Sequence, residues 1–254
     1  MSVHEQLLAT SRARGAAHLV LVDPDKMDSE SLVHFTTAAT EADVDAFLVG
    51  GSLVVDDSFH ECIRTIKRNT TLPVVIFPGA VSQVSGDADA ILFLSLLSGR
   101  NPEHLIGSQV IAAPIIRKLG LEAISTAYML VESGRTTSAE FMSNTKPLPR
   151  NKPDIALAHA MAAEILGFKL IYLEAGSGAE QTVPDQMISA IRRYTSMPVI
   201  VGGGISTPAE AAAKAAAGAN FIVTGTVLEK NGDIRLIREL ASAIHHKEAA
   251  VRVV

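Results

Sequence analysis

The chain has 254 residues, of which 48% are hydrophobic and 19% are charged, and its formal net charge is -5. This length and apolar content exclude a disordered chain and allow either one large α/β barrel or a compact two-domain protein. The negative charge gives no long-range attraction for nucleic acid, so any phosphate must be bound by local backbone groups and a few side chains.

Along the chain, short strands are predicted to alternate with helices. Eight short runs are nearly continuous in hydrophobic residues, as expected for strands of a parallel sheet that is covered on both faces: 18–22, 46–49, 74–77, 90–96, 123–131, 170–173, 199–201 and 221–223. The segments between them with helical character are 29–41, 58–69, 102–118, 154–166, 184–194, 208–217 and 233–247. This alternation predicts a single-domain (β/α)8 TIM-type barrel over residues 1–254.

Two connections depart from this regular alternation of strands and helices. The third crossover, from Gly79 to Asp89, is too short and too rich in glycine and serine for a full helix. A long insertion, from Glu132 to Pro153, follows the fifth strand, where loops of a barrel lie over the active face and act as lids. The alternative for the insertion is a plain surface excursion. An open doubly wound sheet is the alternative fold, but its usual G-x-G-x-x-G motif is missing.

The composition also bears on the compartment. The single cysteine, Cys62, cannot form an internal disulfide, and no Cys/His group has zinc-ligand spacing, so a reducing cytoplasm is expected. The amphipathic N-terminus lacks the pattern of a signal peptide. No apolar run reaches the roughly 18 residues of a membrane span. We therefore expect a cytoplasmic protein without an integral membrane segment, which can still touch a membrane surface transiently.

Charged residues follow the first strand, in Asp23-Pro24-Asp25-Lys26. Mg²⁺ prefers one or two carboxylates together with water and phosphate oxygens, so Asp23 can hold a metal that a diphosphate substrate completes. Lys26 can pair with the same diphosphate. Ser52 follows the second strand, and adjacency in the barrel would bring its hydroxyl group beside Asp23. The alternatives are a turn and helix cap for Asp-Pro-Asp and a loop cap for Ser52.

Glycine-rich ends follow the last three predicted strands: Tyr172-Leu173-Glu174-Ala175-Gly176-Ser177-Gly178, Gly202-Gly203-Gly204 and Gly225-Thr226. Backbone N–H groups freed by glycine can approach an anion closely, and a helix that begins just beyond adds its partial positive charge. These ends predict a phosphate cradle. Glu174 is the candidate general base for a substrate hydroxyl group, especially if partial burial raises its pKa. Its alternative role is a structural hydrogen bond, and Tyr172 offers a phenolic donor or simply packs.

Taken together, these motifs resemble those of the geranylgeranylglyceryl phosphate synthase family, and the resemblance covers almost the whole barrel. The segments that carry it are Val22-Asp23-Pro24-Asp25-Lys26, Val49-Gly50-Gly51-Ser52, Tyr172 to Gly178, Val201-Gly202-Gly203-Gly204-Ile205 and Thr224-Gly225-Thr226. The chain looks more like the longer of the family's two groups. One departure is Thr226, where asparagine is expected in many members.

The resemblance implies a Mg²⁺-dependent prenyltransferase that joins geranylgeranyl diphosphate to sn-glycerol 1-phosphate, forming the first ether bond of archaeal membrane lipids. It implies Asp23 and Ser52 as metal ligands, Asp23 and Glu174 as catalytic residues, and a homo-oligomer, either a dimer or a hexamer. The prenyl tail needs an apolar groove, which the third crossover and the adjoining helices would provide. The residues implied to bind glycerol phosphate are Tyr172, Leu173, Glu174, Ala175, Gly176, Ser177, Gly178, Gly203, Gly204, Gly225 and Thr226.

Two other functions stay open from the residues alone. The glycine-rich ends suit a barrel isomerase, epimerase or synthase that acts on a small phosphate, although this enzyme would need an acid/base pair that the sequence does not offer. A non-catalytic protein that binds a phosphate ligand would need only the cradle. Mg²⁺-dependent release of diphosphate distinguishes the prenyltransferase from both.

Overall fold

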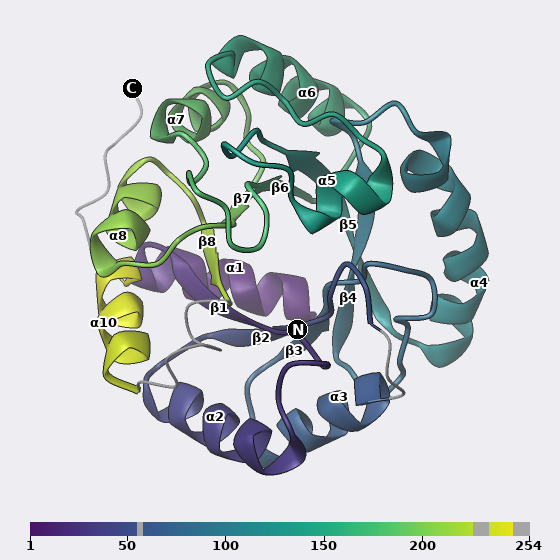
Figure 1. Cartoon of the computed structure of the whole chain (residues 1–254), viewed down its shortest axis with the longest axis vertical. Coiled ribbons are helices and arrows are strands. Elements are labelled where there is room, and N and C mark those ends of the chain that lie inside the picture. The colour runs from purple at the N-terminus through teal and green to yellow at the C-terminus, as the bar shows by residue number, and fades with distance from the viewer. Residues whose placement is uncertain (55–57, 226–233, 246–254) are drawn as a thin grey trace.

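The computed structural model describes residues 1–54, 58–225 and 234–245, and their eight parallel strands close into a barrel. Each strand pairs with the next one along the chain, and β1 pairs with β8, while the helices form a ring around the barrel (Figure 1). The strands are β1 Ala17–Val22, β2 Ala46–Val49, β3 Val74–Ile76, β4 Ala90–Leu96, β5 Glu122–Leu130, β6 Leu170–Glu174, β7 Val199–Gly202 and β8 Phe221–Thr224. The predicted TIM-type barrel is confirmed.

The outer helices follow the predicted segments closely. They are α2 Ser29–Glu41, α3 Ser58–Asn69, α4 Ser108–Leu119, α6 Pro153–Ile165, α7 Asp185–Tyr194, α8 Pro208–Ala216 and α10 Ile234–Ile244. The first turn of the predicted 102–118 helix is instead a π-helix, η1 Glu103–Gly107. The third crossover is described throughout and contains no helix, as expected. Within the described parts of the chain, no helix combines the length and the hydrophobicity that a membrane crossing requires.

Among the described residues, two helices were not predicted. One is α5 Ser138–Ser143, inside the insertion, and the other is α1 Val3–Arg14 at the N-terminus. Ser2 and Glu5 form a reciprocal capping box at the start of α1, and the Glu122 carboxylate accepts the backbone N–H groups of Val3 and His4. Leu7 of α1 packs with the residues that fill the barrel interior. In this way α1 covers the amino ends of the strands.

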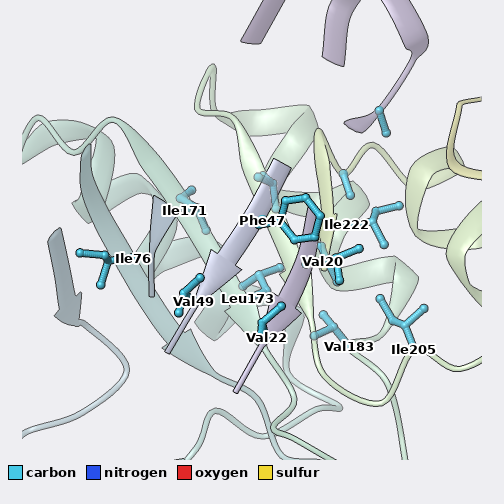
Figure 2. Packing of buried hydrophobic residues seen from close by; sticks show 14 of the residues in the cluster. Val20, Val22, Phe47, Val49, Ile76, Ile171, Leu173, Val183, Ile205 and Ile222 are labelled. Atoms are coloured by element: carbon cyan, nitrogen blue, oxygen red, sulfur yellow. The ribbon is translucent and has the colours of Figure 1, made fainter. Parts of the chain in front are cut away.

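Successive strand residues belong to two different apolar layers. One layer fills the barrel interior and includes Leu19, Leu48, Val75, Leu92, Ile124, Tyr172 and Phe221. The other lies between the strands and the helices, and Figure 2 shows part of it, including Val20, Val22, Phe47, Val49, Ile171 and Leu173. Cys62 packs in this outer layer, where burial raises the pKa of its thiol to about 12.

The outer layer allows a matched test of core packing. Ile63 of α3 is fully buried, so Ile63→Ala removes apolar contacts and leaves a cavity, and we expect it to lower the free energy of unfolding by roughly 2–5 kcal/mol. Ile165 of α6 is 87% exposed, and Ile165→Ala should change the free energy of unfolding by less than about 0.5 kcal/mol. Urea unfolding followed by circular dichroism measures both. Equal losses in the two variants would contradict the position of Ile63 in the core.

Candidate active site

Two cavities open at the carboxyl ends of the strands. The first, which we call the apolar cavity, has a volume of about 410 Å³ and lies between the third crossover, η1, α4 and α5. Its apolar walls include Leu53, Val81, Val84, Ile91, Leu94, Ala112 and Ile116. The second, which we call the glycine-lined cavity, has a volume of about 310 Å³ and lies at the ends of β6, β7 and β8. Phe77, Tyr128 and Ala139 line both cavities, so the two meet at these residues.

The glycine-lined cavity depends on the close approach of the β6 and β7 ends. A Cβ atom on Gly203 would lie 2.4 Å from the backbone nitrogen of Gly176 and 2.5 Å from Oε1 of Glu174. Gly203 also has a φ of +87°, which other residues rarely adopt. Only glycine therefore lets these two strand ends meet around an anion-sized space lined by backbone groups.

Most of the residues expected to bind phosphate line this cavity. They are Glu174, Gly176, Ser177, Gly178, Gly203, Gly204 and Gly225. Leu173 and Ala175 are instead buried in the outer apolar layer, and Tyr172 fills the barrel interior behind the cavity. Thr226 lies outside the described residues. Ala179, Ile205 and Ser206 also line the cavity and follow the glycine-rich ends, but they were not among the residues predicted to bind phosphate.

Glu174 ends β6 with its side chain buried in the glycine-lined cavity. Burial raises the pKa of this carboxyl group to about 7, although the hydrogen bond from the Gly176 N–H and the nearby Tyr172 hydroxyl lower it in part. The Gly176 N–H donates to Oε1 over 2.6 Å. A carboxyl group with this pKa both accepts and releases a proton near neutral pH, which is the property of an effective general base.

Three aromatic rings form a cluster where the cavities meet. The rings of Phe77 and Tyr172 stack with their centroids 5.0 Å apart, and Tyr128 packs edge-on against both. Burial, followed by the charge of Glu174, raises the pKa of both tyrosines well above the usual range. The Tyr172 hydroxyl and Oε2 of Glu174 both lie within 3 Å of the position that a Cβ of Gly202 would take, and this buried hydroxyl has no hydrogen-bond partner among the described residues. Both phenols therefore stay neutral at neutral pH.

The sequence analysis missed Phe77 and Tyr128, although a signal was present. The chain has only three tyrosines. Tyr128 and Tyr172 stand directly opposite each other in the register of β5 and β6, and both face the barrel interior. A search for aromatic residues at inward-facing positions near the carboxyl ends of the predicted strands would have found them.

Asp23 and Ser52 follow neighbouring strands, β1 and β2. Asp23 Oδ2 pairs with the Lys26 ammonium group at 3.1 Å, and Oδ1 lies 3.2 Å from the position that a Cβ of Gly51 would take. Ser52 comes directly after Gly51 and lines the apolar cavity. The structure thus brings Asp23, Lys26 and the Gly51-Ser52 segment to one edge of the barrel mouth.

The oxygen atoms at this edge fit Mg²⁺ as a metal that a substrate completes. One carboxylate and one hydroxyl group are hard donors, and Mg²⁺ usually keeps several waters and takes phosphate oxygens as its other ligands. Among residues 1–54, 58–225 and 234–245, no group of three or more His, Cys, Asp or Glu side chains could hold a metal by itself. The donor set is therefore suited to a metal–diphosphate pair and not to a closed protein cage.

The insertion lies over this face, as expected from its position after β5. The Gln181 N–H donates to the carbonyl oxygen of Ser133, and the Arg150 guanidinium donates to the carbonyl oxygens of Glu132 and Thr182. These bonds tie the insertion to the loop that follows β6. Ala139 of α5 reaches both cavities. The insertion is a wall of the site, and its action as a mobile lid stays a prediction.

Comparison with known proteins gives one consistent result. The sequence profile of the PcrB family matches residues 9–244. The chain is 46% identical over 226 residues to geranylgeranylglyceryl phosphate synthase of Chitinophaga pinensis, with 89% of each protein covered. It is 46% identical over 228 residues to the Methanothermobacter marburgensis protein of the same name, covering 89% of this chain and 92% of the relative.

A solved structure is similar over nearly the whole chain. It is the crystal structure of (S)-3-O-geranylgeranylglyceryl phosphate synthase from Thermoplasma acidophilum in complex with its substrate sn-glycerol-1-phosphate. The TM-score is 0.92 and the sequence identity is 36%, with 96% of this chain and 99% of that chain covered.

The raised pKa of Glu174 predicts a pH-dependent cost in stability. The folded protein holds the Glu174 proton more tightly than the unfolded chain, and this preference adds to the free energy of unfolding. The added free energy is complete below the ordinary pKa of 4.5 and is lost as the pH rises through about 7. Glu174→Gln removes this dependence. Between about pH 4 and about pH 8.5, we expect the stability of the variant relative to the parent to rise by on the order of 3 kcal/mol.

Urea unfolding of the parent and of Glu174→Gln at both pH values measures this difference, and contributions from other groups cancel in the comparison. A difference that does not change with pH would contradict the burial of an ionisable Glu174 in the folded protein.

Proposed function

The chain belongs to the PcrB family and is a prenyltransferase, and we propose that it joins geranylgeranyl diphosphate to the hydroxyl group of sn-glycerol 1-phosphate. The products are geranylgeranylglyceryl phosphate and diphosphate. The bond that forms is the first ether bond of archaeal-type membrane lipids. The observation that supports this reaction most directly is the meeting of an apolar and a glycine-lined cavity beside Glu174.

The glycine-lined cavity is the proposed site of sn-glycerol 1-phosphate. Its backbone N–H groups, freed by glycine at three strand ends, suit a phosphate group. A guanidinium nitrogen of Arg135 lies 2.7 Å from the position that a Cβ of Gly178 would take, so one cation stands beside these dipoles at the edge of the cavity. The Thermoplasma acidophilum structure, which contains sn-glycerol-1-phosphate, supports this substrate.

The apolar cavity is the proposed site of the prenyl chain. It runs between the third crossover and α4, where no helix of the crossover fills the space. Burial of apolar surface stabilises each methylene group of a long tail by about 0.8 kcal/mol, so a wall of valine, leucine and isoleucine side chains favours a polyprenyl substrate over a small phosphate ester. The diphosphate end would then lie toward Ser52, at the mouth of the same cavity.

Asp23 and Ser52 are the proposed ligands of Mg²⁺, and Lys26 is the proposed partner of the diphosphate. When bound, Mg²⁺ neutralises the charge that develops on the leaving diphosphate. Lys26 already pairs with Asp23, so it can move from the carboxylate to a phosphate oxygen without crossing the site. The two side chains thus hold the leaving group at the β1 and β2 edge.

Glu174 is the proposed general base. The glycerol hydroxyl loses its proton as the oxygen attacks the allylic carbon, and the Glu174 carboxylate accepts that proton. Phe77 and Tyr128 line both cavities and exclude water from the place where the two substrates meet. Holding both substrates at neighbouring strand ends also removes a large entropic part of the barrier.

We further propose a homo-oligomer, either a dimer or a hexamer, in the cytoplasm with transient contact to a membrane surface. Apolar side chains of η1 and α4 support self-association, because Ile106, Val110 and Ile111 are each more than half exposed. Membrane contact follows from the prenyl substrate, which partitions into bilayers.

A direct product assay tests this function. Purified protein is incubated with Mg²⁺, sn-glycerol 1-phosphate and radiolabelled geranylgeranyl diphosphate, and we expect the label in a phosphatase-sensitive ether lipid. Asp23→Asn should reduce turnover by roughly 100-fold or more, because the leaving diphosphate loses its metal site. The circular dichroism spectrum should stay that of the parent.

The assay can also fail in informative ways. If no ether lipid forms with any prenyl length while sn-glycerol 1-phosphate still binds, another phosphate-binding barrel enzyme or a binding protein becomes the better assignment. Full Mg²⁺-dependent turnover by Asp23→Asn would remove Asp23 from the proposed ligands.

Glu174→Gln separates proton transfer from substrate orientation. The amide keeps the size and the acceptor oxygen of the carboxylate but takes up no proton, so we expect turnover to fall by about 100-fold or more. The parent enzyme should show a pH profile that rises through about 7, where Glu174 loses its proton, and the variant should lack this limb. Steady-state kinetics across pH measures both, and unchanged turnover in the variant would rule out Glu174 as the base.

A further inference from the structure

Gln83 ties together the loops that follow β2 and β3. Its side chain is almost fully buried in the third crossover. The amide Nε2 donates to the carbonyl oxygen of Gly51 at 2.8 Å. The amide Oε1 accepts the N–H groups of Gly51 at 3.3 Å and Gly79 at 3.1 Å. One carboxamide therefore binds both backbone polar groups of Gly51 and joins them to the next loop.

The two loops are packed too closely for side chains to intervene. A Cβ atom on Gly79 would lie 2.1 Å from the carbonyl oxygen of Gly51 and 3.0 Å from the Cα atom of Ser52. The backbone N–H of Gln83 also donates to the carbonyl oxygen of Ala80, which closes the turn that carries Gln83. The position of Gly51 and Ser52 is thus determined by a short, fully bonded turn.

Asp23 lies beside Gly51 as well. Oδ1 of Asp23 is 3.2 Å from the position that a Cβ of Gly51 would take, so Asp23 and Gln83 both contact this segment. The N–H of Gly50 donates to the carbonyl oxygen of Val22, which aligns the ends of β1 and β2. A shift of Gly51 would therefore move Ser52 relative to Asp23.

We propose that Gln83 is a positioning residue for the Mg²⁺ site, which holds Gly51 and so keeps the Ser52 hydroxyl beside Asp23. This inference rests on the proposed function, because it takes Asp23 and Ser52 as the metal ligands. Residues that orient ligands without touching the metal commonly contribute strongly to metal affinity. The side-chain hydrogen bonds that place Gln83 in this role all go to backbone groups of Gly51 and Gly79.

Two substitutions test the proposal. Gln83→Met keeps the approximate volume and removes the three hydrogen bonds, and Gln83→Asn keeps an amide that is too short to span both loops. Binding of Mn²⁺, used as the probe for Mg²⁺, is measured by EPR on the protein with inorganic diphosphate present, which supplies the phosphate oxygens that complete the site. We expect binding to weaken roughly 10-fold. If Gln83→Met fails to fold, Gln83→Asn gives the result.

Kinetics adds a second measurement. The Mg²⁺ concentration for half-maximal activity should rise by a similar factor, and saturating Mg²⁺ should restore most of the turnover. The KM for sn-glycerol 1-phosphate should stay unchanged, because the glycine-lined cavity lies at β6 to β8, on other strands. A merely structural role for Gln83 would lower turnover without this dependence on Mg²⁺.

Gln109→Met is the matched control. Gln109 is another glutamine whose Nε2 donates to two backbone carbonyl oxygens, those of Leu94 and His104, but it has no bond to Gly51. Its substitution should lower stability and leave Mn²⁺ binding at the parent value. If Gln109→Met weakens Mn²⁺ binding as much as Gln83→Met does, the effect is not specific to Gly51 and the proposal is overturned.

Asp23→Asn distinguishes a failure of the proposed Gln83 role from a failure of the proposed metal site. Weak Mn²⁺ binding by Asp23→Asn together with parent-like binding by the Gln83 variants would leave the metal site in place and overturn the role of Gln83. Parent-like binding by Asp23→Asn would overturn the metal site itself, and the positioning role with it.

Discussion

The alternation of side chains along the barrel strands is the constraint on which the site depends. In β1, Leu19 faces the barrel interior, and continuing the same period of two through Leu21 brings Asp23 to the mouth. In β6, the interior residues Leu170 and Tyr172 lead to Glu174 in the same way. Both carboxylates therefore turn inward because the strand ahead of them packs its apolar residues inward. A slip of one residue in either strand would turn its carboxylate toward the helices.

Glu174 is buried among glycines, and the backbone N–H of one of them, Gly176, donates a hydrogen bond to its carboxylate. A buried carboxylate without hydrogen bonds is costly, and the Gly176 N–H at 2.6 Å offsets part of this cost. Gly203 allows that approach because it has no Cβ. The proposed phosphate cradle and the proposed proton acceptor are thus parts of one arrangement, in which burial raises the pKa of Glu174 and the Gly176 N–H lowers it in part.

Much of this arrangement was predictable from the sequence, because strand ends and glycines are local signals. Near-continuous apolar runs gave the strands and their order, and the three glycine-rich ends converge as a parallel barrel requires. The inward positions of Phe77 and Tyr128 near strand ends were a usable signal, but their contacts, like those of Gln83, were not predictable. Each acts through contacts with other strands or loops, and the register that brings Tyr128 opposite Tyr172 is set by the closed barrel. The helix α1 was missed although its capping box, Ser2 with Glu5, is a local pattern.

The two proposed anionic substrates are bound by different physical means at neighbouring parts of the barrel mouth, because β8 pairs with β1. Around Glu174 the glycine-lined cavity offers backbone dipoles, and a cation placed beside this carboxylate would stabilise its ionised form and lower its pKa below the range useful for a base. The β1 and β2 edge, with Asp23 and Lys26, carries charges that can neutralise a leaving diphosphate. Because Lys26 and the proposed metal ligands come from β1 and β2, and Glu174 from β6, charge at the leaving group is separated from the base. A raised pKa near 7 and strong stabilisation of diphosphate can then coexist in one barrel.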